Sequence, residues 1–229
     1  MKKIQKLILA VNIAVISAIF YMNYVYQWNG FDFTLKCICS ASFALLGVIN
    51  LVYSLITKAG NKPFYIGMSA GLLLAFLGDV LIEYDFIVGA ATFALAHVGF
   101  IASYCFLQKM QKLDYVTCGV LFLGCLIFLL FWPFFSFSVA IFRVVCIIYA
   151  LFISMMLGKA MGNFIREKNL VKATIAVASA LFFFSNLMLV CDRFIRFWGW
   201  TEQACMGTYY PALCFLALAM CIKSMKDHQ

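Results

Sequence analysis

The sequence predicts an all-α membrane protein, a bundle of eight transmembrane helices with both ends of the chain in the cytoplasm. Of its 229 residues, 66% are hydrophobic and 11% are charged, whereas a soluble domain has about 45–50% apolar and about 25% charged residues. The apolar runs are continuous and about 20 residues long, which is the length that a helix needs to cross ~30 Å of hydrocarbon. The basic residues gather at alternate ends of these runs.

Eight apolar runs follow one another, each bounded by charged or turn-forming residues. The first is long and lacks a small-residue cleavage site, so we expect a retained helix and not a signal peptide. Continuous runs favour helices over the alternating strands of a barrel. Because few residues lie outside these runs, we expect residues 1–229 to form a single transmembrane helical domain. The expected spans are 7–26, 34–57, 64–84, 86–107, 115–131, 136–158, 172–191 and 204–224.

The charge distribution predicts how the helices are oriented. Thirteen of the 17 Lys and Arg residues fall on one side when the loops are assigned alternately. Lys36, Arg193 and Arg196 fall on the other side, and Arg143 lies inside the sixth run. Basic loops favour the cytoplasmic side, so we expect both ends of the chain there. The net charge of +8 follows from this asymmetry, and we expect membrane lipid and no nucleic acid as a partner.

The ten cysteines do not form a metal or disulfide pattern. Nearly all fall inside apolar runs, no CxxC pair occurs, and the only histidines are His97 and His228. We therefore expect the cysteines to act as small buried apolar residues, without a metal site. A weak sequence similarity between the two halves of the chain aligns Gly78 and Asp79 with Ser185 and Asn186. A duplication that gives a 4+4 pseudo-repeat and a chance likeness both remain open as explanations.

Several polar residues lie within the predicted spans, where a charge costs roughly 2.5–3.5 kcal/mol. At ~1.5 Å rise per residue, most of them fall in the non-cytoplasmic half of the membrane and His97 falls near the middle. Tyr209 and Tyr210 begin the last span on the same side. We therefore expect one polar pocket in the outer half. The candidate residues of this kind are Asp79, Glu83, His97, Arg143, Asn186 and, at the end of the seventh run, Asp192.

These residues also have purely structural interpretations. Asp79 would pair with Arg143 and stabilise the bundle. Glu83, one turn later on the same helix face, would reach the interface. His97 would form an interhelical hydrogen bond. The tyrosine pair would belong to the aromatic belt at the membrane surface.

A family resemblance appears in the segment from Ala70 to Phe100, which is AGLLLAFLGDVLIEYDFIVGAATFALAHVGF. It resembles the signature of the YhhN-like lysoplasmalogenases, which are multi-pass membrane vinyl ether hydrolases. Two later segments, FFFSNLMLVCDRF and GTYYPALCFLAL, resemble the second half of that family. Two positions depart from its pattern, because Asn186 follows Ser185 where an aspartate is usual and Leu213 stands where a glutamine is expected. The matching signature residues are Gly78, Asp79, Phe86, Gly89, Phe93, Ala96 and His97.

The resemblance implies that the substrate is a lysophospholipid, a lysoplasmalogen, and that no cofactor is needed. Acid cleaves a vinyl ether: a proton is added to the carbon distal to the ether oxygen, and water captures the oxocarbenium ion, giving a fatty aldehyde and a glycerophospho-alcohol. Since Asn186 cannot exchange a proton, we expect slow or no turnover unless Glu83 or Asp192 substitutes. The resemblance implies catalytic roles for Asp79, Asn186 and His97 and substrate binding by Tyr209, Tyr210, Arg143, Glu83 and Ser185.

Two other function classes remain open. A lipid or small-solute transporter would use Asp79 as its coupling carboxylate, although Pro211 is the only one of three prolines inside a span. An inactive lipid-binding homologue would explain Asn186. In each case the chain is expected to be an integral multi-pass membrane protein. It would lie in the inner membrane of a bacterium, or in the endoplasmic reticulum or another internal membrane of a eukaryote.

Overall fold

The computed structural model describes residues 3–28, 32–133, 135–137, 139–195 and 199–227. In these ranges the chain forms eight α-helices and no strand, and each helix is long and apolar enough to cross a membrane. The all-helical fold with eight spans, predicted from hydropathy, is confirmed. Lys2, Arg196 and His228 lie outside the described residues. The helices are α1 (Lys3–Trp28), α2 (Phe33–Ile56), α3 (Lys62–Leu81), α4 (Phe86–Leu107), α5 (Lys112–Phe131), α6 (Ala140–Arg166), α7 (Leu170–Phe194) and α8 (Thr201–Lys226).

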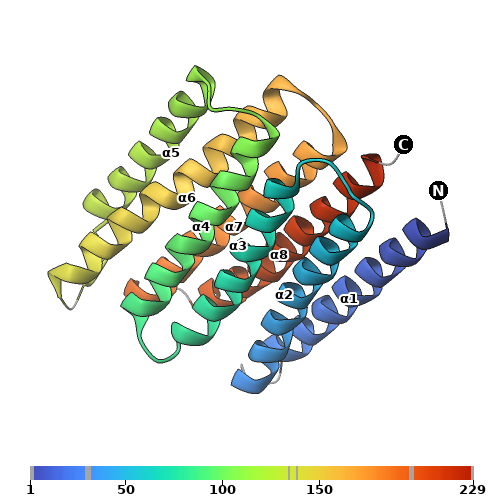
Figure 1. Ribbon diagram of the computed structural model, residues 1–229. Helices are drawn as coiled ribbons and strands as arrows, with labels where there is room; N and C mark the ends of the chain where they lie inside the picture. Colours follow the sequence, from blue (N-terminus) through green and yellow to red (C-terminus); the bar gives the residue numbers. More distant parts are fainter. Residues whose placement is uncertain (1–2, 29–31, 134, 138, 196–198, 228–229) are drawn as a thin grey trace.

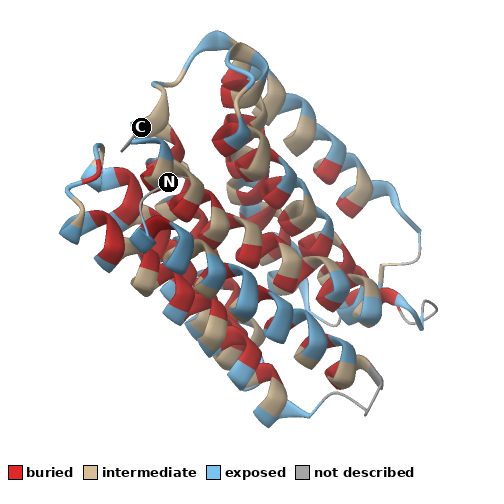
Figure 2. Ribbon diagram, turned by 90° about the vertical axis from the view of Figure 1, so that its right-hand side faces the viewer, coloured by how far each residue is buried: buried red, intermediate tan, exposed pale blue. Residues whose placement is uncertain are grey.

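The helices form one bundle in which both ends of the chain lie at the same end (Figure 1). Helix α8 contacts α1, α2, α3 and α7 and is the most deeply buried of the eight. Helix α5 lies at the edge, and α6 is the only described helix that it packs against. Figure 2 shows buried residues on the facing sides of the helices and exposed residues on their outer sides, as expected for a bundle whose outer surface contacts lipid.

Amide side chains link three of the helices inside the apolar core. The side-chain amides of Asn12 in α1 and Asn50 in α2 donate to each other's carbonyl oxygens at 2.9 Å. The second N–H of Asn50 donates to the carbonyl of Ala217 in α8 at 2.8 Å. These bonds satisfy polar groups that would be costly in hydrocarbon, so they hold α1 against the bundle. All ten cysteines are free and seven are buried.

Two predicted helix boundaries are wrong for identifiable reasons. The sixth span was expected to end at residue 158, before Lys159, yet α6 continues to Arg166. The Lys159 ammonium is fully buried and paired with the Asp114 carboxylate at 2.8 Å, so this lysine does not mark a helix end. Helix α3 ends at Leu81 and not at residue 84, because a short turn leads to Asp85, whose carboxylate caps the start of α4.

Candidate functional site

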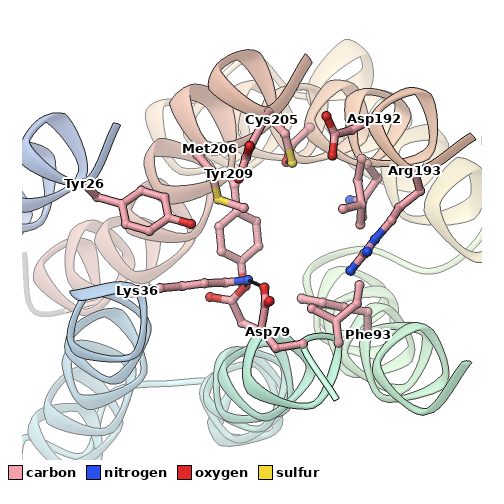
Figure 3. A pocket seen from close by; sticks show the side chains of 15 residues that line it. Tyr26, Lys36, Asp79, Phe93, Asp192, Arg193, Cys205, Met206 and Tyr209 are labelled. Atoms are coloured by element: carbon pink, nitrogen blue, oxygen red, sulfur yellow. Dashed lines mark hydrogen bonds and ion pairs between the residues drawn. The ribbon is translucent and has the colours of Figure 1, made fainter. Parts of the chain in front are cut away.

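A polar cavity of about 200 Å³ opens at the end of the bundle opposite to the ends of the chain. It lies where α1, α3 and α7 end and α2 and α8 begin, and Figure 3 shows side chains from these helices pointing into it. We call it the polar cavity. Its position means that residues far apart in the sequence meet in one space. Its polar lining residues are Tyr26, Lys36, Asp79, Glu83, Ser185, Asn186, Asp192, Arg193, Glu202 and Tyr209.

Asp79 lies in this cavity beside a lysine from the neighbouring helix. The Lys36 ammonium is 3.3 Å from Asp79 Oδ1 and 2.5 Å from Glu83 Oε1, and it is almost fully buried. The Ser40 hydroxyl, one turn after Lys36 on α2, donates to the other carboxylate oxygen of Asp79. A buried carboxylate needs such partners, because an uncompensated charge would be strongly unfavourable in this environment. The charge partner of Asp79 is thus Lys36 and not Arg143.

The two tyrosines of α8 lie on the inner side of this charged group. The Tyr210 hydroxyl donates to the carbonyl of Lys36 at 3.3 Å and is 3.4 Å from the Ser40 hydroxyl. The Tyr209 hydroxyl donates to the carbonyl of Ala75 at 3.4 Å, and its ring lines the polar cavity. Tyr209 therefore contributes an aromatic wall, whereas Tyr210 supports α2 from behind.

Asn186 enters the same cavity from α7 in a fixed orientation. The Tyr149 hydroxyl of α6 donates to Asn186 Oδ1 at 2.5 Å, and Asn186 Nδ2 donates to the carbonyl of Phe182 at 2.7 Å. One N–H of the amide remains for a group in the cavity. Tyr149 was not identified from the sequence, because a tyrosine inside an apolar run looks like any other core aromatic residue.

His97 lies behind Asn186 and does not line the polar cavity. Its Nδ1 is 2.5 Å from the carbonyl of Phe93, and its ring stacks on Phe182 with the centroids 4.9 Å apart. The His97 ring also packs edge-to-face against the Tyr149 ring. Since the carbonyl accepts a hydrogen bond, Nδ1 carries the proton, and the buried Nε2 has no hydrogen-bond partner. His97 thus contacts Tyr149, which in turn holds Asn186.

The mouth of the cavity carries further charges and Ser185. The Asp192 carboxylate accepts from the Thr201 hydroxyl at 2.8 Å, and Arg193 and Glu202 line the same opening. Ser185 lines the cavity, and its hydroxyl is 3.4 Å from the Cys205 sulfur. Two cationic and four anionic side chains therefore surround one small space, which suits a ligand that carries both charges.

Arg143 lies away from the polar cavity. It is exposed near the start of α6, its guanidinium lies 5.0 Å from the centroid of the Phe137 ring, and it does not line the cavity. The structure thus gathers Asp79, Glu83, Ser185, Asn186 and Tyr209, adds Lys36, and leaves His97, Tyr210 and Arg143 outside the lining. In the described part of the chain, no group of three or more His, Cys, Asp or Glu residues could hold a metal ion.

Comparison with known proteins identifies one family. A sequence model of the YhhN family matches residues 31–220, which include every residue of the polar cavity except Tyr26. That family includes lysoplasmalogenases, and the match suggests a membrane hydrolase-like function. No curated protein and no solved structure matches the chain.

Proposed function

Because this chain belongs to the YhhN family, we propose that it hydrolyses the vinyl ether bond of lysoplasmalogens within the membrane. The observation that carries the proposal is that Asp79 of α3 and Asn186 of α7 line one small cavity. Acid-catalysed hydration of a vinyl ether needs a carboxylic acid as its proton donor, and the Asn186 amide is placed to orient the water. The products are a fatty aldehyde and a glycerophospho-alcohol.

In the first step the Asp79 carboxyl donates its proton to the vinyl carbon distal to the ether oxygen. The resulting oxocarbenium ion is positively charged, and the Asp79 carboxylate left behind lies in the same cavity as this ion. The carboxyl must be protonated when the substrate binds. Glu83 supports this state, because its carboxylate, 2.5 Å from Lys36 Nζ, keeps the ammonium paired while Asp79 is neutral.

In the second step water adds to the oxocarbenium carbon and forms a hemiacetal. The free N–H of Asn186 is available to hold this water, and the proton that the water loses returns to Asp79. The hemiacetal then collapses: the bond to the glycerol oxygen breaks, the proton of the hemiacetal hydroxyl passes to that oxygen, and the aldehyde and the glycerophospho-alcohol are released. Asn186 cannot accept the proton itself, so this site lacks the second carboxylate that would stabilise the cation or act as a base on water.

The test is an assay of purified protein with a lysoplasmalogen and the matched acyl lysophospholipid, in which released aldehyde and fatty acid are measured. We expect aldehyde only. Asp79→Asn should abolish activity, and Asn186→Asp should raise it, since a general acid or base contributes typically 10² to 10⁴ in rate. Glu167→Gln is the control, because it removes an exposed carboxylate between α6 and α7, at the other end of the bundle.

Three outcomes would contradict the proposal. They are full activity in Asp79→Asn, no gain in a folded Asn186→Asp, and release of fatty acid in place of aldehyde. Passage of the same lipid across liposomes without any aldehyde would support a transporter instead. Lipid binding with neither activity would support an inactive homologue. Circular dichroism and size-exclusion profiles of each variant separate these outcomes from misfolding.

A further inference from the structure

Two apolar voids, which we call the passage, adjoin the polar cavity in sequence and lead between α4 and α6. A second void shares Ile82, Phe93 and Leu189 with the cavity. A third void shares Ala90, Val145 and Tyr149 with the second. Because each void borders the next through shared side chains, the three form one series that starts beside Asp79. Figure 3 shows Phe93, which also lines the second void, among the side chains around the polar cavity.

The passage is lined almost entirely by apolar groups. Among the described residues around the second void, only Tyr149 has a hydroxyl group. That hydroxyl donates a hydrogen bond to Asn186. This void measures about 10 Å³ and the third about 150 Å³. The second void is therefore the narrow part of the passage, and an apolar space of this kind excludes water. A hydrocarbon chain is therefore the chemical group that fits it.

The third void opens to the side of the bundle within the predicted hydrocarbon region. Ala91 and Ile148 line it and are exposed on the outer surface of the bundle. Ala94 and Ile148 each lie eight residues from the start of their helices, so both are about 12 Å from the end of the bundle that carries the polar cavity. Small residues on α4 leave the opening unfilled. A chain leaving here would enter lipid and not water.

We propose that this passage holds the hydrocarbon chain of a single-chain lipid whose polar head occupies the polar cavity. The inference rests on the proposed function and adds the location of the chain to it. Phe93 and Tyr149 form the narrow point, so the head-to-chain junction lies beside Asp79 and Asn186. The residues that select the chain are then Ala90 and Val145, which line both of the apolar voids.

A larger apolar groove exists between α5 and α7 and is the natural competitor. It measures about 430 Å³ and is lined by residues that include Gly124, Phe128 and Leu187. It shares no lining residue with the polar cavity or with the second void. A chain lying there would be separated from a head group beside Asp79, so size alone does not make this groove the lipid site.

Photo-crosslinking distinguishes the two locations. The probe is a saturated 1-O-alkyl lysophospholipid with a diazirine halfway along its chain, incubated with the full-length protein and mapped by mass spectrometry. We expect labels on α4 and α6 at Ala91, Ala94 or Ile148. Labels confined to α5 and α7 around Gly124, or spread over all lipid-facing helices, would overturn the proposal.

Matched substitutions test the passage itself. Ala90→Leu fills the narrow part and should lower specific labelling about tenfold, which corresponds to about 1.4 kcal/mol of binding free energy. Adding Val145→Ala to this variant should restore part of the lost labelling. Gly124→Leu is the control, because a side chain there meets open space and fills only the competing groove. If Ala90→Leu does not fold, Ala94→Leu tests the outer void. Unchanged labelling in a folded blocking variant would contradict the inference.

The saturated ether probe separates this inference from the proposed function. It lacks the vinyl bond, so its labelling reports where the chain lies whether or not the protein is a hydrolase. Labelling in the passage without aldehyde release from a lysoplasmalogen would overturn the proposed function alone. Aldehyde release with labels outside the passage would overturn this inference alone.

Discussion

Asp79 is a buried carboxylate whose charge is balanced by one lysine of another helix. The side chains of Asp79 and Lys36 are 5% and 4% exposed, respectively. Ion pairs at this depth add little net stability over apolar substitutes, but removing one partner leaves a buried charge without compensation. The pair therefore makes the stability of the α2–α3 contact depend on the same residue that we propose as the acid.

Lys36→Met should consequently destabilise the protein by about 3–5 kcal/mol. The double variant Lys36→Met with Asp79→Asn should recover part of this loss, because both buried charges are then absent. Thermal unfolding of the four proteins in detergent completes a double-mutant cycle. Additive effects of the two substitutions would show that the two side chains do not interact in the folded protein.

Sequence reasoning located the depth of the site residues but not the direction in which each side chain points. Asp79, Glu83 and Asn186 were found because a polar residue in an apolar run is conspicuous and its depth follows from counting. Arg143 was expected to join them on the same grounds. Successive residues of a helix point about 100° apart, so equal depth does not bring two side chains together. Lys36 was assigned to the non-cytoplasmic side and considered as a phosphate ligand, but its pairing with Asp79 was missed for the same reason.

At the scale of elements, a buried charge cluster fastens α5 to α6. The Asp114 carboxylate at the start of α5 accepts from Lys159 Nζ at 2.8 Å and from Arg166 Nη1 at 2.6 Å. Lys159 also donates to the carbonyl of Lys109 in the preceding connection at 3.0 Å. Since α6 is the only described helix that α5 packs against, this cluster holds an element that has few other contacts.

Two glycines of α6 allow this close contact, and two glycines of α5 provide the control. A Cβ at Gly158 would be 2.7 Å from the backbone nitrogen of Cys118, and one at Gly162 would overlap the Asp114 carboxylate. Gly158→Ala and Gly162→Ala should each lower stability, since the helices must separate, at a cost of roughly 1–3 kcal/mol.

The control positions are Gly119 and Gly124, where a Cβ meets nothing within 4 Å. Alanine there should be neutral or stabilising by about 0.5–1 kcal/mol, because glycine is unfavourable in a helix interior. Thermal unfolding of all four variants measures the difference. Equal effects at the α5 and α6 positions would mean that the α5–α6 contact is looser than the structure shows.

The bounds of the fourth span were predicted correctly, whereas the end of the sixth was wrong because a charge there is buried. The fourth span was predicted as 86–107, and α4 covers those residues. It is capped by Asp85, whose side chain is exposed. The sixth was cut short at Lys159 because hydropathy counts a lysine as solvated. The Asp114 carboxylate and the Lys109 carbonyl stabilise that lysine inside the bundle, and such contacts between distant residues are not visible in a local window.

At the scale of the whole molecule, the polar cavity and the ends of the chain lie at opposite ends of the bundle (Figure 1). The basic residues Lys58, Lys109 and Lys168 lie in connections at the same end as the chain ends. The positive-inside rule predicts that this end faces the cytoplasm. The cavity would then open toward the non-cytoplasmic leaflet, and the lipid head group would enter from there.

An orientation test checks this arrangement in the full-length protein. An epitope inserted after Pro133, between α5 and α6, should bind an impermeant antibody on intact cells or sealed vesicles with the non-cytoplasmic face outward, whereas an epitope after Asp227 should bind only after permeabilisation. The expectation follows because thirteen of 17 basic residues are predicted on the side of the chain ends, and each resists transfer across the membrane. Wild-type behaviour of both tagged proteins in size-exclusion chromatography is the control. Antibody binding to the tag after Asp227 without permeabilisation would reverse the orientation and place the polar cavity on the cytoplasmic side, so that substrate would have to arrive from the cytoplasmic leaflet.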